Sequence, residues 1–140
     1  MVAMSETTVR RALPGEHDQM VALWAEAGLA VPTEDEWSVL AADNTSVLLA
    51  AEAGDRLLGC AVAAFDGWRA YIYHVAVTPE ARHEGVAHAL MSAAEAHLRE
   101  AGAKYVFVMV PESNTDGLAL AASIGYLPEG DIVLSKAMVA

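Results

Sequence analysis

The sequence predicts an α+β fold in one domain, residues 1–140, with a single mixed, mostly antiparallel sheet. The length of 140 residues is that of one ordinary domain, and the hydrophobic fraction of 55% excludes a disordered chain. Apolar residues recur with strand spacing in the middle of the chain and with helix spacing on either side of it. After residue 68, strand-like and helix-like segments alternate, which favours a parallel crossover in the sheet.

The first part of the chain predicts a weak strand and two helices. Residues 7–13, TTVRRAL, alternate weakly and are the candidate first strand. Pro14 opens a pattern with apolar residues every three or four positions, and Gly28 ends it. In PTEDEWSVLAAD, Thr33 is a candidate N-cap and Glu36 stands three residues later, which is the spacing of a capping box.

Three antiparallel strands are expected next. The segments SVLLAAEA and RLLGCAVAAF flank Gly54-Asp55, a pair typical of a hairpin turn. Asp66-Gly67 then turns the chain into WRAYIYHVAV, the third of these strands. The two turns place the three segments side by side in the sheet.

The last part of the chain predicts two helices and two strands. A long helix is expected from Glu84 to Ala101, with Gly102 as its end. The segment KYVFVMV is nearly continuously apolar, as is typical of a strand that is buried on both faces. A helix from about Thr115 to Ile124 precedes DIVLSKAM, which is the expected last strand.

Composition and charge narrow the classes of function. The net charge of −11 argues against nucleic acid and anionic membranes as partners. It is compatible with a cationic amine as substrate, and an acidic solvated surface would give the same charge. No apolar run approaches the ~20 residues that span a bilayer, and MVAMSETTVRR lacks the apolar core of a secretory signal. Cys60 is the single cysteine and the histidines show no metal-ligand spacing, so we expect a cytoplasmic protein without a metal.

The segment TPEARHEGVA, before the long helix, has the features of an anion site. The first N–H groups of a helix have no partner within it, and the helix dipole favours an anion there. Gly85 lets the backbone approach a bulky ligand, Ala87 keeps the next turn clear, and Arg82 adds a positive charge. Taken alone, these residues also fit tight packing of a helix on a sheet.

In its wider context, this loop resembles that of the GCN5-related N-acetyltransferase (GNAT) superfamily. The superfamily signature is Gln/Arg-x-x-Gly-x-Gly/Ala between the fourth strand and the third helix, and RHEGVA at residues 82–87 fits its three fixed positions. HVAVTPEAR leads into the loop, and PESN and IGY follow at family-like spacing. The resemblance covers nearly the whole chain, most closely to small stand-alone bacterial members. It implies a GNAT-like fold with about four helices, splayed central strands and acetyl-CoA as the donor.

The resemblance also implies the site residues. In that superfamily the pyrophosphate rests on backbone amides of the signature loop, and the pantetheine arm pairs with the fourth strand like an added strand. The implied cofactor-binding residues are Val75, Ala76, Val77, Arg82, His83, Glu84, Gly85, Val86, Ala87, His88 and Asn114. The reaction is attack of a neutral amine on the thioester, which needs a base, a donor to the oxyanion and an acid for the thiolate.

Three positions depart from the superfamily pattern. Glu84 stands where members commonly carry glycine or a basic residue, and we expect it to weaken the site without abolishing it, because a carboxylate in the first helical turn can face solvent. Many members have a tyrosine seven residues after the asparagine that corresponds to Asn114, and this chain has Ala121 there. Some members have a glutamate five residues before that asparagine, and this chain has Met109 there. The alternative function is therefore a non-catalytic acyl-CoA-binding or regulatory domain, or an interaction module with a closed cofactor site.

The fourth strand carries the candidate catalytic residues Tyr71, Tyr73 and His74. Histidine titrates near neutral pH and suits a base, although hydrogen-bonded packing is the favoured interpretation for His74, and aromatic packing for the tyrosines. Strand alternation sends both tyrosines to one face and His74 to the other. Trp24 and Trp37 lie where the family's acceptor pocket is lined, although we favour core positions for both.

We therefore predict an N-acetyltransferase that transfers acetyl from acetyl-CoA to an amine. The acceptor is a small amine, an amino-acid derivative or a protein N-terminus, and the sequence does not choose among them. The apolar composition of the chain leaves a homodimer open.

Overall fold

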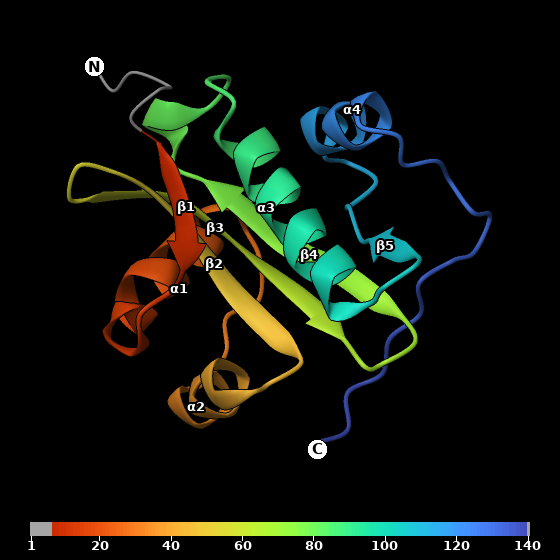
Figure 1. Cartoon of the computed structure of the whole chain (residues 1–140), viewed down its shortest axis with the longest axis horizontal. Coiled ribbons are helices and arrows are strands. Elements are labelled where there is room, and N and C mark those ends of the chain that lie inside the picture. The colour runs from red at the N-terminus through yellow and green to blue at the C-terminus, as the bar shows by residue number, and fades with distance from the viewer. Residues whose placement is uncertain (1–6, 140) are drawn as a thin grey trace. The chain divides into compact units, whose positions relative to one another are not determined.

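The computed structural model describes residues 7–139, which fall into two compact units: one ends at Met109 and the other begins at Val110. The first unit holds all the described strands (Figure 1). Its elements are β1 (Thr8–Arg11), the 3₁₀ turn η2 (Pro14–Glu16), α1 (His17–Glu26), α2 (Glu34–Ala42), β2 (Ser46–Ala53), β3 (Arg56–Phe65), β4 (Ala70–Val77), the 3₁₀ turn η3 (Pro79–Ala81), α3 (Val86–Ala101) and β5 (Val106–Val108). The second unit contains α4 (Thr115–Ser123).

The strands form one mixed sheet in the order β1-β2-β3-β4-β5. The pairs β1–β2, β2–β3 and β3–β4 are antiparallel. β5 runs parallel to β4 after the crossover through α3. Both expected hairpins are present, with Ala53 paired to Arg56 at the first and Phe65 paired to Ala70 at the second. The predicted fold class is confirmed.

Local sequence signals set the helix ends. Thr33 Oγ1 accepts a hydrogen bond from the Glu36 N–H at 3.1 Å, and Glu36 Oε1 accepts one from the Thr33 N–H at 2.8 Å. This reciprocal pair is the predicted capping box at the start of α2. At the end of α3, Gly102 has a φ of 104°, a left-handed conformation that favours glycine, so the predicted end is also confirmed.

Helices pack on both faces of the sheet. On one face α1 and α2 form a buried cluster with the strands, which comprises Met20, Trp24, Trp37, Leu48, Cys60, Val62 and Ala76. On the other face α3 crosses β3 and β4 (Figure 1). Gly59 permits this close approach, since a Cβ there would lie 2.7 Å from the Ala76 carbonyl oxygen and 3.1 Å from a methyl group of Leu90.

The buried cluster settles the structural role of three residues. Trp24 and Trp37 are only 1% and 5% exposed, so the prediction that they are core residues is confirmed. Burial also raises the pKa of the Cys60 thiol to about 12, which keeps it protonated and unreactive at neutral pH. Cys60 is therefore a small packing residue of β3.

Two strand predictions at the end of the chain are wrong. KYVFVMV yields only the three-residue β5, and these residues are half-buried rather than covered on both faces. Residues 131–138, DIVLSKAM, form no strand, and Ile132 and Leu134 are 82% and 87% exposed. A strand needs a neighbour for its backbone groups, and none of the strands described pairs with this segment. The helices found between residues 7 and 139 are too short or too polar to cross a bilayer.

Candidate functional site

The last part of β4 has one open edge. β5 pairs with β4 only as far as Ile72. From residue 73 to Val77, none of the strands described lies against that edge. Its backbone N–H and C=O groups are therefore placed to pair with an extended ligand, as an added strand would. Three residues predicted to pair with a ligand lie on this edge: Val75, Ala76 and Val77.

A β-bulge lies in the middle of the open edge. β4 has two residues, His74 and Val75, where β3 has one, Ala61. His74 has a φ of 54°, a left-handed conformation that costs a residue with a side chain about 1–2 kcal/mol. Such bulges bend a strand and change the direction of its side chains. The bulge thus lies where β4 parts from β5.

Hydrogen bonds to α1 and to the segment after it hold the bulge. The Trp24 indole N–H donates to the His74 carbonyl oxygen at 2.8 Å, and His74 Nε2 donates to the Ala30 carbonyl oxygen at 2.9 Å. The Trp24 and His74 rings meet edge to face, with centroids 5.4 Å apart. Because a carbonyl only accepts, Nε2 carries the proton and only Nδ1 of neutral His74 is left to accept another.

The bulge overturns the alternation predicted for β4. The rings of Tyr73 and His74 are in contact, with centroids 5.4 Å apart, and Tyr73 packs against the same cluster that contains Trp24. Tyr71 precedes Tyr73 by two residues on the regular part of the strand, so it lies on the same face. The extra residue in the strand brings His74 to that face too. The prediction that His74 faces away from the tyrosines is wrong.

Tyr73 is held in its protonated form. Burial raises the pKa of its phenol, and the negative charge of Asp43 raises it further. Asp43 stays ionised because the N–H of Thr45 donates to its carboxylate at 2.8 Å and the Thr45 hydroxyl does so at 2.9 Å, which lowers the Asp43 pKa. A neutral phenol is a proton donor, so Tyr73 is in the state that a general acid requires.

The loop after β4 leads into the N–H groups of the first turn of α3, which have no partner within the helix. The first hydrogen bond into the helix runs from the Ala89 N–H to the Gly85 carbonyl oxygen at 3.0 Å. The N–H groups of Val86, Ala87 and His88 precede it and have no partner one turn earlier in the helix. Arg82 Nε donates to the Val77 carbonyl oxygen at 3.3 Å, which holds a guanidinium beside the loop. These features are those of an anion site.

The conformation of this loop corrects the predicted start of the helix. His83 and Gly85 have φ values of 63° and 84°, so two left-handed residues flank Glu84. α3 begins at Val86, because the left-handed Gly85 is its N-cap. Glu84 is therefore in the loop rather than in the first helical turn, and the residue is half-buried.

Asn114 lies in the second unit, where its side chain caps α4. Its Oδ1 accepts a hydrogen bond from the Gly117 N–H at 2.9 Å. The side-chain oxygen is thereby used for capping, and the Nδ2 group is the donor that remains for a ligand.

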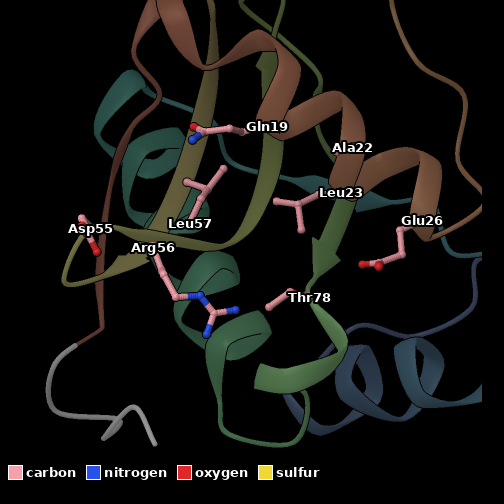
Figure 2. A pocket seen from close by; sticks show the side chains of 8 residues that line it. All are labelled: Gln19, Ala22, Leu23, Glu26, Asp55, Arg56, Leu57 and Thr78. Atoms are coloured by element: carbon pink, nitrogen blue, oxygen red, sulfur yellow. The ribbon is translucent and has the colours of Figure 1, made fainter.

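An open hollow of about 400 Å³ lies between α1 and the start of β3 (Figure 2). Its lining residues are Gln19, Ala22, Leu23, Glu26, Asp55, Arg56, Leu57 and Thr78. The Arg56 guanidinium points toward Thr78, the first residue of the loop (Figure 2). The Thr78 hydroxyl donates to the Glu80 carboxylate and lowers its pKa, and the charges of Arg56 and Arg82 lower it further. The hollow contains none of the predicted site residues.

Across residues 7–139, no group of three potential ligands could hold a metal ion.

A row of side chains that sequence reasoning missed continues the face of Tyr73 along β4. The rings of Tyr71 and Phe107 stack, with centroids 5.6 Å apart. The guanidinium carbon of Arg69 lies 5.2 Å from the Phe107 ring centroid and 4.8 Å from that of Trp68. Phe107 joins this row only because β5 pairs in register with β4, which no local pattern reveals. We call Trp68, Arg69, Tyr71 and Phe107 the aromatic strip.

Comparisons with known proteins agree on the fold. The sequence profile of the acetyltransferase (GNAT) family matches residues 14–126. An aminoglycoside acetyltransferase from an uncultured soil metagenomic sample, solved with sisomicin, is 18% identical, with 97% of this chain and 98% of that one covered and a TM-score of 0.78. A ribosomal-protein-alanine N-acetyltransferase from Brucella melitensis biovar Abortus 2308 is 17% identical, with 93% and 98% covered and a TM-score of 0.75.

A protein of another described role shares the same fold. A transcriptional regulator from Bacillus halodurans C-125 is 19% identical, with 93% of this chain and 99% of that one covered and a TM-score of 0.82. At these identities the similarity of the solved structures shows a shared architecture, and the profile match shows the family. The predicted GNAT-like fold is confirmed.

Proposed function

The chain belongs to the acetyltransferase (GNAT) family, whose members use acetyl-CoA, and we propose that residues 1–140 act as one N-acetyltransferase domain with an amine acceptor. The acceptor is a small amine, an amino-acid derivative or a protein N-terminus. One observation carries the proposal: the open edge of β4 leads directly into a loop that offers helix N–H groups. A ligand with an extended amide-bearing arm and a pyrophosphate matches both features in that order.

The residues of this chain fit the donor at each of its parts. Val75, Ala76 and Val77 offer backbone groups to the pantetheine arm. The N–H groups of residues 83–88 and the charge of Arg82 would hold the pyrophosphate. Bound there, acetyl-CoA supplies an acetyl group activated as a thioester.

Three side chains on one face are assigned to the transfer. Nδ1 of His74 accepts the proton that the amine loses as its new bond to the acetyl carbon forms. Tyr73, whose raised pKa keeps the proton on its phenol beforehand, donates that proton toward the sulfur as the thioester bond breaks. Tyr71 lies next on this face and lines the path of the acceptor. Tyr73 thereby replaces the acid absent at Ala121.

Calorimetric titration with acetyl-CoA, followed by assay of thioester turnover over a panel of amines, tests the proposal. We expect saturable binding and turnover with at least one class of amine. Tyr73→Phe is expected to lower kcat about 10²-fold with acetyl-CoA affinity unchanged, because removing a general acid affects the chemical step. Binding without turnover by any amine would favour the non-catalytic alternative, and no binding at millimolar ligand would rule out both.

Removing the charge of Glu84 is expected to improve the site. A carboxylate ~5 Å from a phosphate costs about 0.8–3 kcal/mol, so Glu84→Gln should tighten acetyl-CoA binding by roughly 4-fold to over 100-fold. The gain should shrink as salt rises, because salt screens the repulsion. Glu100→Gln, at the far end of α3, is the control and should leave the affinity unchanged. Equal affinities for wild type and Glu84→Gln at low salt would show that Glu84 does not face the phosphates.

A further inference from the structure

The aromatic strip is continuous with the residues assigned to the transfer. Arg69, Tyr71 and Tyr73 follow one another at two-residue steps, so they share one face. The rings of Tyr71 and Phe107 stack on that face, and the Arg69 guanidinium lies over Phe107. An acceptor whose amine reaches Tyr73 therefore has the strip on one side of it.

The guanidinium of Arg69 is positioned by contacts with aromatic rings rather than by an ion pair. Within residues 7–139 it makes no ion pair and donates no hydrogen bond from its side chain, and its contacts are the faces of Trp68 and Phe107. The N–H groups of Arg69 and Trp68 both donate to Asp66 Oδ1 at 2.8 Å and so shape the turn. These bonds lower the pKa of Asp66, and the nearby Arg69 charge lowers it further without a hydrogen bond between the two side chains. The planar N–H fork of Arg69 thus remains available to a molecule that binds from outside.

Exposure and charge indicate what binds there. Trp68 is 76% exposed beside the exposed Arg69, and tryptophan and arginine are the side chains most enriched at binding hot spots. Two rings contact the guanidinium, and a guanidinium fits a carboxylate through two parallel hydrogen bonds. In a chain with a net charge of −11, this exposed cation is a local feature that favours an anionic group.

The spacing along β4 limits where that carboxylate stands in the acceptor. Strand residues advance ~3.3 Å each, so the Cα atoms of Tyr73 and Arg69 lie about 13 Å apart. The guanidinium leans back over Phe107, which pairs with Tyr71, so its distance from Tyr73 is roughly 7–13 Å. Two or three residues of an extended peptide cover about 7–10 Å, and the side chain that bears the carboxylate spans the rest.

From these observations we propose that the acceptor is a peptide N-terminus with an acidic side chain at its second or third residue, and that Arg69 of the aromatic strip binds that carboxylate. The inference rests on the proposed N-acetyltransferase function and narrows its acceptor. Arg69 contacts the acceptor, and it determines specificity rather than the chemistry of transfer.

Peptides that differ in one residue test the inference. Glutamate is placed at position two, three or six of an otherwise uncharged peptide, with glutamine at the same position as reference. Wild type is expected to prefer glutamate at position two or three by about 10-fold to 100-fold in kcat/KM, and to show no preference at position six. Arg69→Gln should abolish the preference, and Arg69→Glu should shift it to lysine at the same position. Arg99→Gln, an exposed arginine on α3, should behave as wild type.

The outcomes separate the inference from the proposed function. The inference would be overturned if all peptides were acetylated at equal rates, or if Arg69→Gln kept the wild-type preference for glutamate. Either result would leave the N-acetyltransferase function intact. Should no peptide be acetylated, peptide binding is read from acrylamide quenching of tryptophan fluorescence, since Trp68 is exposed while Trp24 and Trp37 are buried. If the glutamate peptides protect Trp68 from quenching in the wild type but not in Arg69→Gln, the binding site is supported even though no acetylation is seen. Absence of protection would also overturn the inference.

Discussion

Gly85→Ala is expected to weaken acetyl-CoA binding by about 10-fold to 100-fold while the protein stays folded, because the change in conformation removes about one charge-assisted hydrogen bond of roughly 1.5–3 kcal/mol. Gly85 caps α3 with a φ of 84°, and the N–H groups of Val86, Ala87 and His88 follow it directly. Alanine pays about 1–2 kcal/mol for a left-handed backbone, so the loop is driven toward another conformation and the N–H groups turn away. Calorimetric titration measures the affinity, and thermal unfolding measures the stability.

Gly102 provides the matched control at the other end of the same helix. It has a φ of 104°, and no atom lies within 4 Å of the position of an added Cβ. Gly102→Ala should therefore lose about 1–2 kcal/mol of stability from the same backbone strain and keep the wild-type affinity. Equal losses of affinity in both variants would mean that helix stability rather than loop geometry controls binding.

Trp24→Phe is expected to lower both stability and turnover. The indole N–H is the donor to the His74 carbonyl oxygen in the bulge, and Trp24 is 1% exposed. Phenylalanine leaves that partly buried carbonyl without its partner, at a cost of about 1–3 kcal/mol in the free energy of unfolding. The bulge then loses the bond that fixes Tyr73 and His74 beside the open edge, and we expect kcat to fall further than acetyl-CoA affinity. Denaturant unfolding and steady-state kinetics measure the two effects.

Trp37→Phe separates the bulge from general loss of packing. Trp37 belongs to the same buried cluster, with its ring centroid 6.4 Å from that of Trp24. No hydrogen bond joins its indole to β4 in the described part of the chain. This variant should lose stability through the smaller ring and retain most of kcat. A fall in kcat as large as that of Trp24→Phe would show that the cluster, rather than the one hydrogen bond, supports the site.

The parts of the fold that the sequence predicts correctly depend on local signals. The capping box at Thr33, the glycine after α3 and both hairpin turns each depend on a few neighbouring residues, and each is present in the structure. The loop before α3 also follows from a short motif, although its left-handed His83 moves the helix start beyond Glu84. Local chemistry therefore predicts where elements begin and end to within a few residues.

The parts that the sequence does not predict depend on distant residues. Trp24 and His74 are 50 positions apart, and strand periodicity alone does not reveal that an indole on α1 holds a bulge in β4. The contact between Arg69 and Phe107 was not predicted for the same reason, because it depends on how β5 is aligned with β4. The prediction of a last strand is wrong for the opposite reason. Apolar alternation in residues 131–138 is a local signal for a strand, but it does not show whether a neighbouring strand is there to pair with it.

The bulge in β4 also bears on the solubility of the chain. A strand edge with unpaired backbone groups is a template on which another copy of the protein can add a strand, and long straight edges of this kind promote aggregation. The left-handed His74 interrupts the edge after Tyr73, so neither neighbouring stretch is long enough to support an extended intermolecular ladder. A flexible amide-bearing ligand can follow such a bend, whereas the regular strand of a second molecule cannot.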